Sequence, residues 1–237
     1  MRSRQPLGER LAPPRPDLEH ALMSARARAL STGGVELQQA LVREADTVAA
    51  DAGIERQAAA LYAGTIAALQ LRDVPRARRY LDRLTPLVAS HRAGARVARL
   101  MSAELALANG DADRALAEAG GASARPETLL AAQAALRAGR PEQAAQRLQT
   151  WVTIHPADGT AWQWLATAQS AQGLALRAIR SEAEARVAWL DYPAARDRLR
   201  AAQEMARRGN VDHIEASIID TRARAVESLF REQALER

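Results

Sequence analysis

The histidines are the side chains of this chain best suited to acid–base catalysis or metal binding. They occur at four separated positions, His20, His91, His155 and His213, and none lies in an HExxH motif. Asp17, Glu19 and His20 share one turn and form the best metal candidate, but acidic residues in a first helical turn also stabilise the helix dipole. We therefore expect no catalytic constellation, no metal and no cofactor in this chain.

The composition excludes further kinds of chemistry. All 33 basic residues are arginine and there is no cysteine, so a Schiff-base lysine, a P-loop lysine and a thiolate metal site are all absent. The serines show no nucleophile elbow. The sequence pI of 10.7 reflects arginine, which stays protonated above about pH 12, while the net charge is only +5. Basicity is thus a weak argument for nucleic acid, and we expect a protein or peptide partner.

A basic segment is the second candidate site. Between Arg72 and Arg99, eight arginines and two aspartates give a local charge of +6. Arg76, Arg79 and Arg83 recur at helical spacing and should share one face. That face is either the solvated outer side of a helix or a docking patch for an acidic partner, such as another domain of the same protein.

The elements that position these side chains are predicted to be helices. Alanine, leucine, arginine, glutamate and glutamine dominate, and aromatic residues make up only 3%. We expect an all-α fold of about eleven to twelve helices, with a Pro-rich tether at 1–16 and a helical array over 17–237. The clearest predicted helices span 17–30, 35–50, 54–71, 76–90, 127–138, 141–153, 160–172, 174–189, 194–208 and 211–235. No apolar run reaches the roughly 18 residues of a transmembrane helix.

The predicted helices recur with a period of about 34 residues. Gly139 and Gly173 are 34 residues apart, and so are Ala144 and Ala178. Each pair marks a turn followed by the start of a helix. The best repeats occupy 125–190, and the long segment 211–235 is expected to cap the array.

This pattern resembles the tetratricopeptide repeat, which runs W-x2-L-G-x2-Y, A-x3-F and P over 34 residues. The matching positions of the unit near 125 are Thr128, Ala131, Ala132, Ala135, Ala144, Leu148 and Pro156. Those of the unit near 159 are Trp162, Leu165, Ala166, Gln169 and Ala178, with Glu182 where an aromatic residue is usual. The resemblance implies a right-handed solenoid of antiparallel helix pairs, in which small residues allow two helices to cross closely.

In the tetratricopeptide-repeat family, the first helix of each pair lines a concave binding surface. The repeat register assigns to that surface Tyr62, Glu104, Gln133, Gln163 and Thr167, with Trp164 beside them. Trp162 and Trp164 are two residues apart and must face different ways, so Trp162 is expected in the core and Trp164 at the groove. The alternative for Trp164 is packing on Trp151 or Trp189.

The order of parts is also similar to the C-terminal region of bacterial zinc metallopeptidases of the β-barrel assembly-enhancing kind. The matching parts are the Pro-rich tether, a helix from Asp17, degenerate repeats ending near Leu190-Asp191-Tyr192, and a helix over 216–224. This resemblance implies a non-catalytic docking arm in the periplasm, with an N-terminal peptidase domain of the same polypeptide as one partner. The alternative is a free-standing cytoplasmic scaffold that assembles partner proteins.

Overall fold

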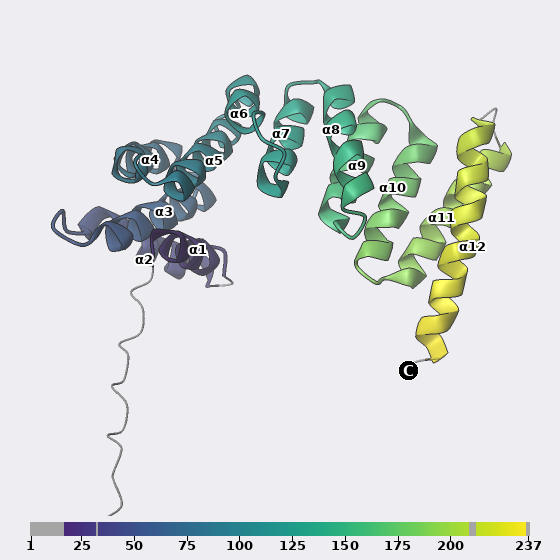
Figure 1. Ribbon diagram of the computed structural model, residues 1–237, viewed down its shortest axis with the longest axis horizontal. Coiled ribbons are helices and arrows are strands. Elements are labelled where there is room, and N and C mark those ends of the chain that lie inside the picture. The colour runs from purple at the N-terminus through teal and green to yellow at the C-terminus, as the bar shows by residue number, and fades with distance from the viewer. Residues whose placement is uncertain (1–16, 32, 209–211, 236–237) are drawn as a thin grey trace, which may run out of the picture. The chain divides into compact units, whose positions relative to one another are not determined.

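The computed structural model describes residues 17–31, 33–208 and 212–235, and every regular element in them is a helix (Figure 1). The helices are α1 (Leu18–Ala29), α2 (Gly34–Thr47), α3 (Ile54–Gln70), α4 (Val74–Val88), α5 (Arg92–Ala108), α6 (Ala112–Ala119), α7 (Arg125–Arg137), α8 (Pro141–Ile154), α9 (Gly159–Ala171), α10 (Ala175–Ala188), α11 (Tyr192–Arg208) and α12 (His213–Leu235). The predicted all-α solenoid class is confirmed. The predicted tether at 1–16 lies outside the described residues.

One kind of turn recurs between paired helices. Arg72, Gly110, Gly139 and Gly173 have φ values of 60°, 82°, 70° and 74°. The next residue's N–H then reaches back to a carbonyl five positions earlier, as in Arg140 N to Ala135 O at 2.8 Å and Leu174 N to Gln169 O at 2.9 Å. This bond ends a helix in a Schellman motif, in which glycine suits the positive φ because it has no Cβ. The turns at these four positions were all expected from the sequence, and those at 139 and 173 also from their 34-residue spacing.

The described residues fall into two compact units, unit 1 up to Met101 and unit 2 from Ser102, so that the division lies within α5. In unit 1, α3 contacts α1, α2 and α4. Gly64 of α3 lies against Ala45 of α2 and the ring of Tyr80 of α4. The Tyr80 hydroxyl donates a hydrogen bond of 2.6 Å to Asp46. Burial, and then this bond to Asp46, raise the pKa of Tyr80, so the phenol remains a donor that ties α4 to α2.

In unit 2, each helix from α6 to α12 contacts the next helix in the sequence. One apolar cluster joins α7, α8 and α9 and includes the fully buried Leu148 and Leu165. A second cluster joins α10, α11 and α12 and includes Leu199, Ile219 and Val226. These two clusters form the apolar core of unit 2.

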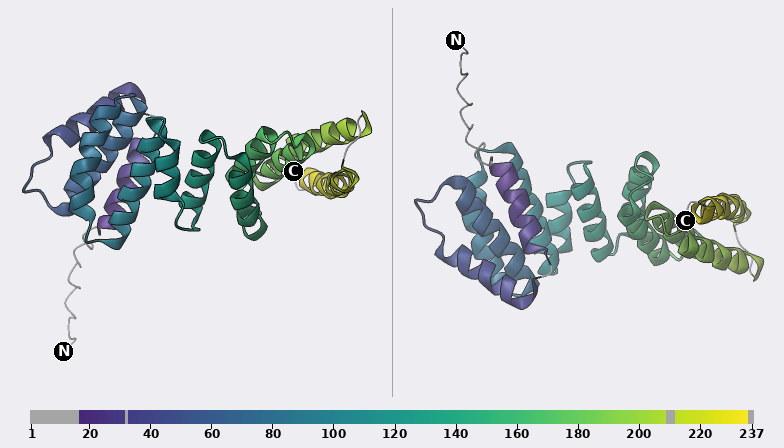
Figure 2. Two further views of the ribbon diagram at one scale, coloured as in Figure 1. Left: turned by 90° about the horizontal axis from the view of Figure 1, so that it is seen from above. Right: turned by 90° about the horizontal axis from the view of Figure 1, so that it is seen from below.

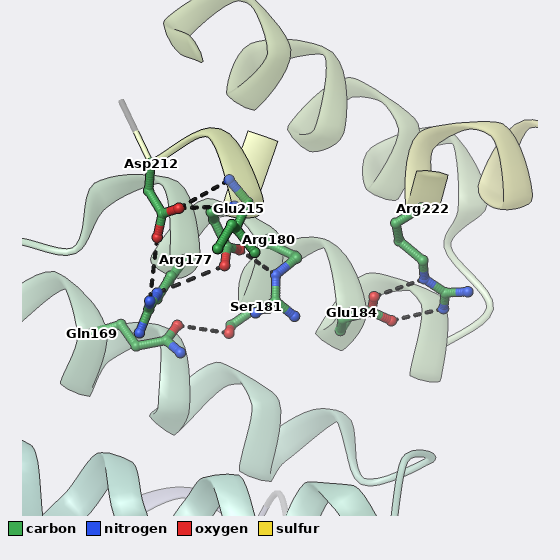
Figure 3. Close-up of polar contacts among 9 residues, drawn as sticks. Gln169, Arg177, Arg180, Ser181, Glu184, Asp212, Glu215 and Arg222 are labelled. Carbon is green, nitrogen blue, oxygen red and sulfur yellow. Dashed lines mark hydrogen bonds and ion pairs between the residues drawn. The ribbon is translucent and has the colours of Figure 1, made fainter. Parts of the chain in front are cut away.

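Ion pairs attach α12 to α10 in addition to this apolar packing (Figure 3). The carboxylate of Glu215, a residue only 4% exposed, pairs with Arg180 and lies 3.6 Å from Arg177. Further along, Nε and Nη2 of Arg222 each donate to one carboxylate oxygen of Glu184, both at 2.7 Å. In the sequence, α11 separates α10 from α12. These ion pairs therefore connect α12 to a helix that is not its neighbour in the chain.

The start of α12 is fixed by Asp212. Its carboxylate accepts the N–H groups of Glu215 at 3.3 Å and Ile214 at 3.0 Å. The pKa of Asp212 lies below its usual range. The main cause is the hydrogen bond from the Glu215 N–H, and the Ile214 N–H and Arg177 lower the pKa further. The acidic residue therefore caps α12 and faces the same arginine that approaches Glu215 (Figure 3).

Candidate functional site

The side of α9 that faces solvent carries several of the binding residues predicted from the sequence. Because α9 contacts α7, α8 and α10, only one of its sides is open. Gln163, Thr167 and Ser170 are exposed on this side at helical spacing. The neighbouring α7 contributes the half-buried Gln133 and Leu136. We refer to Gln133, Leu136, Gln163, Trp164 and Thr167 as the α7–α9 face.

The two tryptophans of α9 differ in their surroundings. Trp162 is 9% exposed and its indole N–H donates to the Pro156 carbonyl at 3.0 Å, so it lies in the core, as predicted. Trp164 is half-buried and packs against the apolar cluster of α7, α8 and α9. A ring seated on the core with part of its surface in solvent is well suited to contact a ligand, since little side-chain entropy remains to be lost.

Asp158 sets where α9 begins and links it to the two preceding helices. Its carboxylate accepts the Ala161 N–H at 3.2 Å and the Trp151 indole N–H at 2.9 Å. Arg125, at the start of α7, donates to both carboxylate oxygens at 2.7 and 2.9 Å. Burial by itself would raise the pKa of Asp158, but hydrogen bonds from Arg125, Trp151 and Ala161 hold it below its usual range.

Asp158 was not expected from the sequence. The signal that could have found it is local, because aspartate is a preferred residue immediately before a helix. Its partner Arg125 stands 33 residues earlier and can be paired with it only in the folded chain. Asp158 therefore positions the α7–α9 face without belonging to it.

We expect Asp158 to make unit 2 sensitive to acid. Its pKa in the folded protein lies below the unfolded value of about 3.9, so its stabilising effect is complete above about pH 5 and is lost as the pH falls through the folded value. The Asp158→Asn variant should be less stable at neutral pH and should lose less stability on acidification. Urea unfolding followed by tryptophan fluorescence across this pH range measures both effects. Equal acid sensitivity in the two proteins would contradict this role.

Two predicted groove residues lie outside the α7–α9 face. Tyr62 is 3% exposed and its hydroxyl accepts a hydrogen bond of 3.0 Å from Arg26. The structure thus places Tyr62 in the core of unit 1 instead of on an open groove, because α3 is covered by three helices. Glu104 is half-buried on α5.

The predicted basic patch lies on α4, and two of its three arginines have partners within unit 1. Arg76 lies 3.3 Å from the Asp73 carboxylate. Arg83 donates at 3.2 Å to the Ala45 carbonyl in the last turn of α2, where carbonyls have no partner in their own helix. Arg79 is exposed. The patch thus has a structural role, while its docking role stays a prediction.

The possible metal cluster at the start of α1 has a structural explanation. Asp17 accepts the His20 N–H at 2.7 Å and so caps the helix. In the part of the chain that the structure describes, no three histidine, aspartate or glutamate side chains gather as metal ligands would. None of the described helices combines the length and apolar character needed to cross a bilayer.

No protein-family model matches the sequence, and comparison with curated proteins finds no significant match. The likeness to tetratricopeptide repeats therefore rests on the residues and turns described above. What the sequence and the structure establish together is the fold class, an all-α, solenoid-type fold in which each helix of unit 2 from α6 to α12 packs on the next.

Proposed function

We propose that the protein is a non-catalytic docking module that binds a protein or peptide segment on the α7–α9 face. The observation that carries this proposal is the half-buried Trp164, seated on the core cluster beside exposed polar side chains. Aromatic residues held in this way are frequent energetic anchors of protein interfaces. The amides of Gln133 and Gln163 add groups that both donate and accept, as a peptide backbone requires.

The resemblance to tetratricopeptide repeats supports the same surface. In that family the first helices of successive pairs line the binding groove, and here the corresponding helices α7 and α9 contact each other. We further propose that the chain serves as the docking arm of a periplasmic zinc metallopeptidase. A free-standing cytoplasmic scaffold is the alternative. An HExxH domain encoded upstream in the same reading frame would support the docking arm of a metallopeptidase over the free-standing scaffold.

The test begins by selecting peptides from a random display library on the immobilised protein. Replacing Trp164 with alanine should weaken binding of a selected peptide at least about tenfold, since a truncated anchor commonly costs 2 kcal/mol or more. Trp189→Ala is the matched control, because Trp189 is a second tryptophan with 47% of its surface exposed, at the end of α10. Unchanged affinity in Trp164→Ala, with both variants folded, would remove the α7–α9 face as the binding surface.

A further inference from the structure

A groove between α11 and α12 is the most basic hollow described in unit 2. The two helices lie next to each other (Figures 1 and 2) and run antiparallel (Figure 1). The groove between them is open to solvent and has a volume of about 420 Å³. Its charged and amide side chains are Arg196, Arg200 and Gln203 from α11 and Arg224, Glu227 and Arg231 from α12. Four guanidinium groups thus share this groove with one carboxylate.

Glu227 is the one carboxylate that lines the groove, while Asp220 and Glu232 at its rim accept hydrogen bonds from the lining residues Gln203 at 2.7 Å and Ser228 at 3.1 Å. Glu227 lies 3.3 Å from Arg231, one turn away on the same helix. Among the described residues, neither Arg200 nor Arg224 forms an ion pair, and Arg224 makes only a long hydrogen bond of 3.4 Å to Thr221. Arginines on facing helices without acidic partners are available to an external anion.

Arg196 is held in place at one end of the groove. Its guanidinium carbon lies 4.4 Å from the centre of the Phe230 ring, within the range of a cation–π contact. Its Nε is buried and has no hydrogen-bond acceptor, since the Asp197 carboxylate is 3.9 Å away. A guanidinium that is already oriented loses less freedom when it binds a carboxylate.

We propose that this groove binds an acidic segment of a partner protein, whose carboxylates pair with Arg196 and Arg200 on α11 and with Arg224 on α12. Arg196 and Arg200 are one helical turn apart, about 6 Å between Cβ atoms. That spacing matches carboxylates one turn apart on a helix, or two residues apart in an extended segment. The proposal does not depend on the α7–α9 face.

The surroundings of the groove favour a short acidic segment over nucleic acid. The exposed Asp197 on α11 and the exposed Asp220 and Glu232 on α12 limit the positive surface to the groove itself. Duplex binding needs many phosphate contacts along a basic track. A few carboxylates on a peptide can instead be satisfied within one groove.

The test uses a fluorescent peptide of alternating glutamate and alanine, with binding to the full chain followed by anisotropy at several salt concentrations. Reversing two charges in Arg200→Glu with Arg224→Glu should weaken binding at least about tenfold and flatten its salt dependence. The matched control is Arg207→Glu with Arg208→Glu, which makes the same charge change at exposed positions of α11 outside the groove. The control should bind within about threefold of the unaltered protein, because exposed distant charges are screened.

Equal weakening in both double variants would overturn the proposal, since only net charge would then matter. A single-stranded or duplex oligonucleotide that binds more tightly than the peptide at the same salt, and loses that affinity in the groove variant, would overturn it in favour of nucleic acid. If charge reversal unfolds the chain, the double variant Arg200→Gln with Arg224→Gln tests the same contacts, and it should also weaken binding of the acidic peptide. The Trp164→Ala variant should bind the acidic peptide normally, so failure of one site is distinguishable from failure of the other.

Discussion

Replacing Gly64 with alanine is expected to destabilise unit 1 by about 2 kcal/mol, although alanine is the better helix former. A methyl group at this position of α3 would overlap the Cβ of Ala45 on α2 and come within 3.2 Å of the Tyr80 ring. The overlapping carbons are both bound directly to helical backbones, so the two helices must move apart. Tyr80 yields little, because its hydroxyl is bonded to Asp46.

Overpacking of this kind costs about 1–3 kcal/mol or more, and exceeds the roughly 1 kcal/mol that alanine contributes to an isolated helix. Urea unfolding followed by circular dichroism measures the net loss, and hydrogen exchange should place it in α2, α3 and α4. Gly121→Ala is the control, because a Cβ at Gly121 meets nothing within 4 Å. Adding Ala45→Gly to Gly64→Ala should restore at least part of the stability. A single variant as stable as the original protein would refute the close contact.

Several helix boundaries could be predicted because the signals that set them are local, although the sequence analysis assigned no range to α5 or α6. Gly139 and Gly173 end their helices through positive φ, and Asp73 and Asp111 cap the helices that follow them. Each such signal lies within a few residues of the boundary that it sets. The start of the helix after Gly173, by contrast, has no side-chain cap of this kind.

The surroundings of individual side chains were harder to predict, because they depend on contacts between distant segments. The repeat register assigns Tyr62 to a groove, but α3 is covered by α1, α2 and α4, and Tyr62 is buried. The same register separates Trp162 from Trp164 correctly, since the two-residue spacing alone places them on different sides of one helix. Periodicity therefore predicts relative orientation along a helix, and tertiary packing decides which side is covered.

The arginine groove illustrates the same limit. The sequence pattern points to Arg72–Arg99 as the basic region, where two arginines of the predicted patch have partners in unit 1. The sequence does not identify Arg200 and Arg224 as a basic site, because they are 24 residues apart in segments that also contain aspartate and glutamate. Only the antiparallel packing of α11 on α12 brings their guanidinium groups into one groove.

The Glu215→Ala variant should lose about 3 kcal/mol of stability, because it leaves the arginines that face Glu215 without their shared carboxylate. Glu215 is 4% exposed and Arg180 retains only 17% of its side-chain exposure, so water replaces the lost partner poorly. The loss should persist at high salt, since buried pairs are screened little. Hydrogen exchange is expected to rise at the start of α12, where Glu215 meets α10 (Figure 3).

Two further variants test whether the loss of stability comes from the buried ion pair. Glu232→Ala removes an exposed glutamate from the same helix and should change stability by less than about 0.5 kcal/mol. Replacing both partners, in Arg180→Met with Glu215→Leu, should cost less than Glu215→Ala alone, because no unpaired charge is then left buried. If Glu215→Ala is no worse than Glu232→Ala, the ion pairs do not hold α12 on α10, and the packing around Ile219 and Val226 must suffice.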